Sequence, residues 1–438
     1  MGERYVNVDR ETPMLLPPDL RDWVADNDLA RLVLDAVGLC DVEGARSNVR
    51  GSGSEQYPPT MLLAVLIYCY ATGVFSSRRI ERATYDSVAV RYLCGNHHPD
   101  HTTIAEFRRR QGALFTRCFA TVAQLAKEMG VLRLGAISLD GTKLAGAASK
   151  RSVRTLAQIE AELKELTALG TDLLAQAEAA DRTDADGGGT QLPPELADAE
   201  VRREKLLAAR AQLLERQQRA REEASAETTG TRRRPRPSAP GPGKPTDKVS
   251  VSEPESRMMH RDNQGRSVQG YNAQAAVDAG GSGLIVGLHL SDETNDCRLI
   301  GAGVAAVVAE AGQPTVVLVD TGYESQVRIA QAEADYGVTV LCPPGRRPQT
   351  DPTKTQRSKS KQKVFELRQK MQVRMEQPIF RELYRRRAVT VEPAFARIKR
   401  HLGFQRLHCW GHQAASAEWT LVGLAHNLRI LQNKRPRA

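Results

Sequence analysis

The sequence predicts an α/β protein in which a mixed sheet flanked by helices follows an all-helical N-terminal domain and carries a helical insert. Helical periodicity without strand patterns fills residues 58–130. Short apolar runs typical of strands lie at 136–146 and recur from residue 270 onward, with helical segments between the later ones. Heptad spacing of apolar residues dominates 152–228, between these two groups of strands.

The helical N-terminal domain is expected to span residues 1–130. Two prolines at 58–59 fit the first turn of a helix. Thr102 or Thr103 can cap a later helix, because a hydroxyl can accept a hydrogen bond from a free N–H of the first turn.

Three consecutive arginines, Arg108, Arg109 and Arg110, lie at the end of that later helix. Short helices, tight turns and an arginine cluster fit a helix-turn-helix surface that contacts DNA. A helical bundle with an exposed basic face fits the same pattern, so both interpretations stay open.

Residues 151–228 predict a coiled-coil helical hairpin inserted into the sheet domain. A glycine-rich stretch at 184–194 separates two arms. The short arms favour a hairpin paired on itself, and pairing with a second subunit is the other interpretation. A basic Pro/Gly-rich linker is expected at 229–248. The residues at heptad steps are Leu156, Ile159, Leu163, Leu166, Ala199, Leu206, Leu213 and Ala220.

The sheet domain is expected at 131–150 and 249–438, and its charge is unevenly distributed. The chain of 438 residues has a net charge of +10. Residues 340–438 contain 22 Lys and Arg but 6 Asp and Glu, which is +16 and leaves −6 for the remainder. A basic C-terminal quarter suits a polyanion such as DNA, although an ordinary solvated surface can carry the same charge.

The cysteine pattern and hydropathy bear on the compartment. Seven scattered cysteines form no CxxC pair, which is typical of reduced thiols in a cytoplasmic protein. No apolar run approaches the roughly 18 residues of a membrane span, and the first residues lack the apolar core of a signal peptide. We therefore expect a cytoplasmic protein without membrane contact.

A histidine-rich segment, CGNHHPDH, offers possible zinc ligands in Cys94, His97, His98 and His101. Four ligands within eight residues differ from the split pairs of most structural zinc sites. Polar loop histidines are the favoured interpretation.

Acidic residues follow two buried strand patterns. The run TVVLVD is apolar without alternation, as in a strand buried on both faces, and it ends on Asp320. The pattern AISLDG likewise ends on Asp140. An Asp followed by Gly is also common in simple turns, so each acid alone is ambiguous.

A third acid lies on a late helix. Pro393 fits the first turn of a helix, which places Glu392 at its N-terminal boundary and Lys399 two turns farther along one face. Grouped carboxylates repel unless a cation joins them, and Mg²⁺ prefers carboxylate oxygens. Two such ions about 3.5–4 Å apart can clamp the attacking and leaving oxygens of a phosphodiester.

Three motifs in this order carry a resemblance to a known family. They are LDGTK at 139–143, VDTGY at 319–323, and the spaced residues Tyr384, Arg387, Glu392 and Lys399. With them the sequence resembles the bacterial insertion-sequence DDE transposases, which have an RNase-H-like catalytic core. The last motif is similar to the Tyr-Arg-Glu-Lys signature of the insertion-sequence-four-like superfamily, with one extra residue between Arg and Glu. The VEPAFARIK version, together with PPTMLLAVLIY and DHTTIAEFRRR, resembles the eleven-eighty-two type branch.

The resemblance covers most of the chain outside the insert and implies roles for single residues. Asp140, Asp320 and Glu392 would ligate two Mg²⁺ ions, for which Mn²⁺ can substitute. Tyr384 could instead only pack its ring, and Lys143 could be an ordinary strand-edge lysine. The residues implied to contact DNA are Tyr384, Arg387, Lys399, Arg400, Lys143, Arg108, Arg109 and Arg110.

The implied function is a DNA transposase that cleaves the ends of an insertion sequence and joins them to target DNA. Its partners would be double-stranded DNA, carrying the terminal repeats or the target, and a second copy of the chain. The implied location is the bacterial cytoplasm, at the nucleoid. An RNase-H-like nuclease and a catalytically silent DNA-binding protein are the alternatives. A tyrosine recombinase using Tyr384 ranks low, because it has no role for three separate acids.

Overall fold

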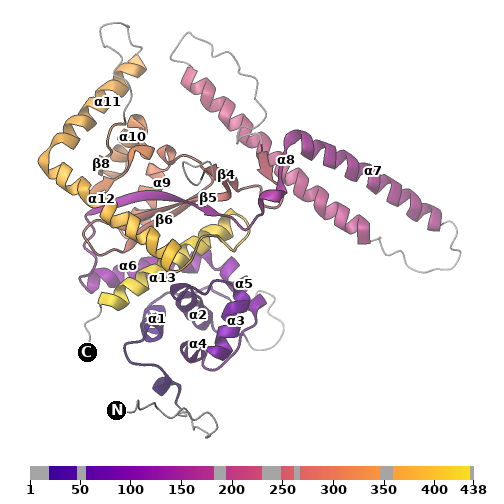
Figure 1. The fold of residues 1–438 in the computed structure, drawn as a ribbon, viewed down its shortest axis with the longest axis horizontal. Helices are drawn as coiled ribbons and strands as arrows, with labels where there is room; N and C mark the ends of the chain where they lie inside the picture. The colour runs from indigo at the N-terminus through magenta and orange to yellow at the C-terminus, as the bar shows by residue number, and fades with distance from the viewer. Residues whose placement is uncertain are drawn as a thin grey trace, which may run out of the picture.

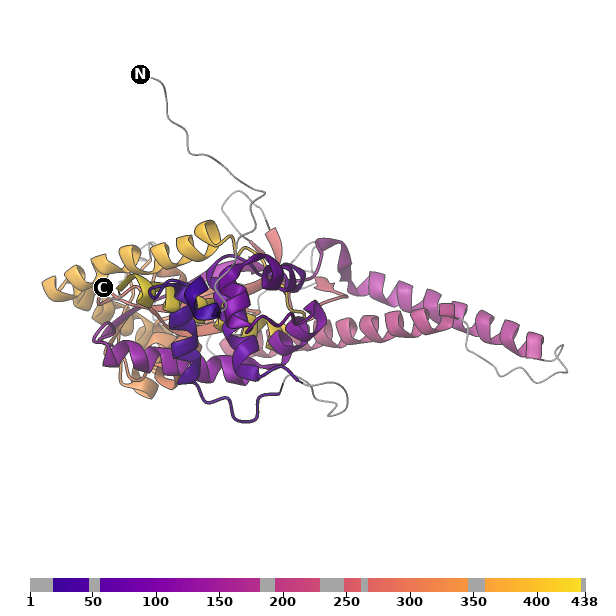
Figure 2. The same ribbon diagram turned by 90° about the horizontal axis from the view of Figure 1, so that it is seen from below.

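The computed structural model describes residues 19–46, 56–181, 194–228, 248–260, 267–345 and 359–434. A central sheet is flanked by helices, with a group of N-terminal helices beside it and two long helices projecting from one end (Figure 1). Seen from below, the projecting pair extends well away from the rest of the molecule (Figure 2). The predicted linker at 229–248 lies outside the described residues, apart from Lys248.

One mixed sheet of six strands forms the centre of the described chain. Its order is β4-β5-β1-β7-β8, and β6 pairs with β5. β5 runs antiparallel to β1, β4 and β6, whereas β7 is parallel to β1 and to β8. This mixed sheet is consistent with the expected RNase-H-like core. The strands are β1 (Ala136–Ala145), β4 (Arg257–His260), β5 (Ser267–Asp278), β6 (Ile285–Ser291), β7 (Val316–Leu318) and β8 (Thr339–Leu341).

The apolar runs of β7 and β8 fit their burial, although β7 lies between β1 and β8 and β8 is at the edge of the sheet. Val317, Leu318, Val340 and Leu341 are all fully buried, as expected of parallel strands covered on both faces. The predicted strand at 315–320 is shorter in the structure, because β7 stops at Leu318 and a 3₁₀ turn follows.

Asp140 lies in the middle of β1 and not at a strand end, so that prediction was wrong. Pairing with β5 continues through Lys143 to Ala145, opposite Gly270. Side chains alternate along the strand. Leu139 therefore points toward Gly303 of α9, and Asp140 points toward α12 on the other face.

Helices cover both faces of the sheet. α9 packs on β6 and β5, α13 packs on β6, and α12 crosses β1 and β5 (Figure 1). These helices are α9 (Ile300–Glu310), α10 (Gln326–Tyr336), α11 (Lys359–Glu376), α12 (Pro378–Ala396) and α13 (His412–Lys434).

The N-terminal region is helical as predicted, and it shares one core with the sheet. A single buried cluster runs from Val24 to Leu431, because α13 packs against α2 and α6 as well as against β6. Asp100, not Thr102 or Thr103, caps α5, since its carboxylate accepts from both of their backbone N–H groups. The helices are α1 (Leu29–Gly38), α2 (Pro59–Ala71), α3 (Ser77–Asp86), α4 (Val88–Leu93), α5 (His101–Arg110) and α6 (Gly112–Glu128), after a 3₁₀ turn at Leu20–Trp23.

The insert separates β1 from its partner β5. It consists of α7 (Leu156–Asp181) and α8 (Pro194–Thr228), and the short strands β2 (Val153–Thr155) and β3 (Lys248–Ser250) pair at its base. The two helices lie side by side along most of α7, and α8 continues past the start of α7 (Figure 1).

Some of the predicted heptad residues form the contact between α7 and α8. Ile159, Leu206 and Leu213 are fully buried there. Ala220 is exposed. The reason is that α8 by then has passed α7: the buried Arg216 donates instead to the carbonyl of Pro254. In the described part of the chain, no helix is long and apolar enough to cross a membrane.

Candidate active site

Two of the predicted acids meet at one arginine. Arg387 of α12 places its Nη2 atom 2.8 Å from Oδ2 of Asp140 and 3.7 Å from Oδ2 of Asp320. The parallel pairing of β1 and β7 causes this, because it brings the end of β7 beside the middle of β1. The Arg387 side chain is 14% exposed, so the pair is largely shielded from water.

Asp320 also serves the local backbone. It caps the 3₁₀ turn Thr321–Tyr323, and its Oδ1 accepts from the N–H of Gly322 at 2.8 Å. Its Oδ2 remains free to face Arg387. The two predicted roles of Asp320, as a turn residue and as a metal ligand, are therefore compatible.

Burial makes the charge on Asp140 costly. Desolvation raises the pKa of Asp140 to about 6, opposed by the nearby Arg387 and reinforced by Asp320. A second carboxylate in reach of the same guanidinium is the arrangement in which an added cation lowers the energy of both acids.

We expect this acid to make the metal-free protein less stable as the pH rises. The folded state keeps a proton on Asp140 up to about pH 6, whereas an unfolded Asp releases it near 3.8. The contribution of Asp140 to the free energy of unfolding is therefore fully present below pH 3.8 and is lost as the pH rises through 6. Asp140→Asn should raise the free energy of unfolding at pH 7 in EDTA by on the order of 2 kcal/mol. Urea titrations at pH 5 and pH 7 measure this change in the free energy of unfolding. An equal change at both pH values would contradict the prediction.

Tyr384 and Lys399 approach the same strands. The hydroxyl of Tyr384 donates to the carbonyl of Val319 at 3.2 Å, next to Asp320. The Nζ atom of Lys399 donates to the hydroxyl of Thr142 and lies 3.3 Å from the carbonyl of Lys143. Both side chains therefore hold α12 and the following turn against the strands that carry the acids.

Glu392 occupies a different setting from the one predicted. α12 runs from Pro378 to Ala396, so Glu392 lies within its last turns and Pro393 is inside the helix. The chain continues as a π-helical turn at Arg397–His401, a rare form often found at functional sites. Glu392 is exposed. Among the residues that the structure describes, no three Asp, Glu, His or Cys side chains are grouped to hold a metal ion.

The chemistry of the site nevertheless suits a hard cation. Asp140 and Asp320 offer carboxylate oxygens, which Mg²⁺ prefers. They converge on one guanidinium, so a positive group already stands between them. The Nε atom of Arg387 is buried without a hydrogen-bond partner, so this donor is available to an acceptor such as a phosphate oxygen, but not to the cation itself.

Two family models match the chain. Residues 238–428 match the model described as a transposase DDE domain. Residues 18–110 match the model described as a transposase domain (DUF772). These matches indicate a DDE-type transposase. The first match includes Asp320, Arg387 and Glu392, whereas Asp140 lies before it, on the far side of the insert. No curated protein and no solved structure is significantly similar to the chain.

The sequence did not single out a polar cluster on the other face of β1 in this transposase. Asp296 accepts from Asn272 at 2.7 Å and from Gln274 at 2.8 Å, and its Oδ1 is 3.3 Å from Nζ of Lys143. Gly141 belongs to the cluster, since an added Cβ would lie 2.1 Å from Gln274 Nε2. The acid-rich segment SDETND, directly after a strand pattern, was the available signal.

The basic residues of the transposase lie in different environments. Lys143 is engaged with Asp296, and Arg400 is exposed. Arg108 is buried, and its guanidinium donates to the Tyr70 hydroxyl at 3.0 Å and to the Phe75 carbonyl at 2.6 Å. It therefore faces the core and not a DNA-binding surface, contrary to the prediction. Arg109 and Arg110 reach the surface.

The histidine-rich segment makes ordinary polar contacts. His98 Nδ1 lies 3.0 Å from the Thr84 hydroxyl, and His101 pairs with Glu81 at 2.8 Å. Cys94 is buried.

Proposed function

We propose that this transposase cleaves the ends of an insertion sequence and joins them to target DNA. The proposal rests on one observation: the carboxylates of Asp140 and Asp320 both face the largely buried guanidinium of Arg387. The spacing of Tyr384 and Arg387 before Glu392 and Lys399 favours the insertion-sequence-four-like superfamily and its eleven-eighty-two type branch. We further propose that two copies act together, because two element ends must be brought to one target.

Asp140 and Asp320 would hold the divalent metal, and Glu392 is proposed as the third ligand. A bound Mg²⁺ or Mn²⁺ would activate the attacking oxygen and neutralise charge on the scissile phosphate. The protein keeps water limited around Asp140 and fixes the position of Asp320 through the 3₁₀ turn. Tyr384 acts as a positioning residue, since its hydroxyl holds the carbonyl of Val319.

The reaction has two balanced steps. Water attacks the phosphorus at the element end, the bond to the 3′ oxygen breaks, and a 3′-hydroxyl and a 5′-phosphate form. That hydroxyl then attacks a phosphodiester of the target, and the 3′ oxygen of the target leaves with a proton. Neither step requires a covalent bond between protein and DNA.

We propose that the guanidinium of Arg387 occupies the position of the metal ion, between the two carboxylates, until DNA binds. Its guanidinium can form bidentate contacts with phosphate, so an incoming strand can draw it away from the two carboxylates. We expect Arg387→Gln to tighten Mn²⁺ binding in the absence of DNA by about tenfold, because it removes a competing charge. Titration of Mn²⁺ by electron paramagnetic resonance measures this affinity. Weaker Mn²⁺ binding than in the wild type would contradict the role.

Glu392 can be tested against a neighbour on the same helix. Glu392→Gln is expected to lower metal-dependent cleavage by about 10²-fold or more, as loss of a metal ligand should. Glu382 of α12 is exposed and pairs with Arg385 at 2.9 Å, so Glu382→Gln is the matched control and should leave the rate unchanged. Equal rates for both variants would remove Glu392 from the site.

The proposed function is tested with labelled duplex DNA that carries the terminal repeats of the element. The wild-type protein is incubated with Mg²⁺, Mn²⁺ or EDTA, and the cut ends are mapped. Cleavage at the repeat boundary that leaves a 3′-hydroxyl and requires metal is the expected result. Binding to the repeats without cleavage under any condition would favour a catalytically silent DNA-binding protein.

A further inference from the structure

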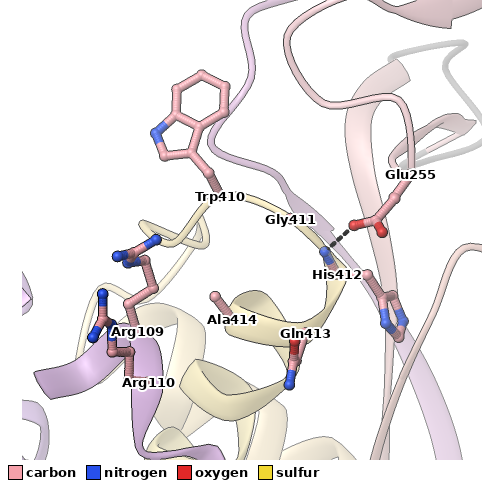
Figure 3. Close-up of a pocket in the computed structure, with 8 residues that line it drawn as sticks. All are labelled: Arg109, Arg110, Glu255, Trp410, Gly411, His412, Gln413 and Ala414. Carbon is pink, nitrogen blue, oxygen red and sulfur yellow. Dashed lines mark hydrogen bonds between the residues drawn. The ribbon is translucent and has the colours of Figure 1, made fainter. Parts of the chain in front are cut away.

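A cavity of about 420 Å³ lies away from the paired aspartates, between the end of α5 and the start of α13. Its volume falls in the range of small-ligand sites. Arg109 and Arg110 stand together on one side of Ala414, with His412 on the other, and the ring of Trp410 projects from the loop above (Figure 3).

Trp410 is presented on a backbone that is fixed on both sides. The N–H groups of His408 and Cys409 donate to the buried Glu418 at 2.6 and 3.0 Å. Beyond the tryptophan, Gly411 N–H donates to Glu253 at 3.3 Å and His412 N–H donates to Glu255. Three carboxylates thus hold the four flanking residues.

The indole itself remains 55% exposed. Single exposed apolar residues are common and need no function. Here, however, the loop around the ring is held by a buried charged group, since Glu418 is 0% exposed. A rigid exposed aromatic next to cations is the arrangement that stacks nucleic acid bases.

The arginines on the opposite wall are available to an anion. Glu106 pairs with Arg109 at 2.6 Å and also with Arg110, and their side chains are 55% and 45% exposed. Exposed ion pairs of this kind contribute little, so a phosphate can compete for either arginine. The neighbouring Arg108 is buried and holds the end of α5 through Tyr70, which also donates to Glu418 at 2.6 Å. One buried network therefore fixes both walls of the cavity.

One edge of β1 leads from Asp140 toward the loop that carries Trp410. β7 occupies the edge up to Ser138, and Lys399 then contacts Thr142. The N–H of Leu407, three residues before Trp410, donates to the Ala145 carbonyl at 2.8 Å. From Asp140 to Ala145 the strand rises about 16 Å, which is roughly five nucleotides of a B-form strand.

We propose that this cavity binds an unpaired nucleotide of the DNA substrate, with its base stacked on Trp410 and its phosphate on Arg109 and Arg110. The inference rests on the proposed DNA function and adds a binding site to it. A protein partner is less favoured, because only one apolar side chain is exposed among charged groups.

The experiment measures binding of the full-length protein in EDTA to two probes. One is a single strand of about 12 nucleotides with 2-aminopurine at internal positions, and the other is a blunt duplex of the same sequence. Trp410→Ala should weaken single-strand binding by about tenfold and abolish quenching of 2-aminopurine, whereas Trp410→Phe should retain both. Tyr85→Ala is the matched control: Tyr85 is 56% exposed but lies on α3, and its loss should change neither readout.

Unchanged affinity and quenching in Trp410→Ala would overturn the site, and so would an unquenched probe on the wild type. Quenching of the probe by the wild-type protein tests the site even if the Trp410→Ala variant does not fold. Arg109→Gln with Arg110→Gln should also lower the salt dependence of binding by about one to two phosphate contacts. Because no metal is present, the test is separate from cleavage. If the wild type cuts DNA but does not quench 2-aminopurine, the proposed function stands and the stacking site is wrong. If it quenches 2-aminopurine but does not cut DNA, the stacking site stands and the proposed function is wrong.

Discussion

Asp140→Asn and Asp320→Asn are each expected to lower the rate of metal-dependent cleavage by about 10³-fold or more. Each change removes one negative oxygen from the position where both carboxylates converge. Charge stabilisation by a bound metal is worth several kcal/mol, and each 1.36 kcal/mol is a factor of about ten in rate. Cleavage of labelled terminal-repeat DNA under single-turnover conditions measures the loss.

The same substitution elsewhere provides the control. Asp335 of α10 is exposed and accepts from Gln331 at 2.6 Å, so Asp335→Asn should cleave like the wild type. DNA affinity in EDTA should be retained by all three variants, since the aspartates are assigned to metal and not to phosphate. Cleavage by Asp320→Asn within about threefold of the wild type would demote Asp320 to a turn residue.

Glu418→Ala is expected to cause the largest loss of stability, about 3–5 kcal/mol. The carboxylate of Glu418 is fully buried and accepts from Tyr70, from the backbone of His408 and from the backbone of Cys409. Its removal leaves those donors unpaired and leaves Arg108 buried without a compensating charge. Urea unfolding followed by circular dichroism measures the change.

An exposed glutamate gives the comparison for that loss. Glu382→Ala should change the free energy of unfolding by less than about 0.5 kcal/mol, because its ion pair with Arg385 is exposed to solvent. A loss below about 1 kcal/mol for Glu418→Ala would contradict the view that this network fixes the N-terminal helices to α13.

The sequence was sufficient to predict the two strand patterns that lead to the aspartates, but not how far each strand extends. Buried parallel strands are visible as apolar runs, so β7 and the acid after it could be located. The length of β1 depends on pairing with β5, whose residues follow the whole insert. Asp140 was therefore placed at a strand end, although it lies within the strand.

Tertiary packing also decided the environments of α12 and Arg108. Pro393 predicts a helix start, because proline is common there, but packing on the sheet carries α12 through it. Arg108 belongs to an arginine run whose members are alike in sequence, and only the fold shows that it faces Tyr70 while its neighbours face solvent. The contacts of Asp296 likewise come from β1 and β5, which are distant from it in sequence.

We propose that a metal held by Asp140 and Asp320 would contact the scissile phosphate. The most direct measurement compares cleavage of ordinary DNA with that of DNA in which sulfur replaces a non-bridging oxygen of that phosphate. Mg²⁺ prefers oxygen ligands, whereas Mn²⁺ is softer and tolerates sulfur better. We predict that the sulfur-substituted DNA is cut at least about tenfold more slowly in Mg²⁺ and that Mn²⁺ restores the rate. Equal cleavage of both substrates in Mg²⁺ would contradict metal contact with the phosphate at this site.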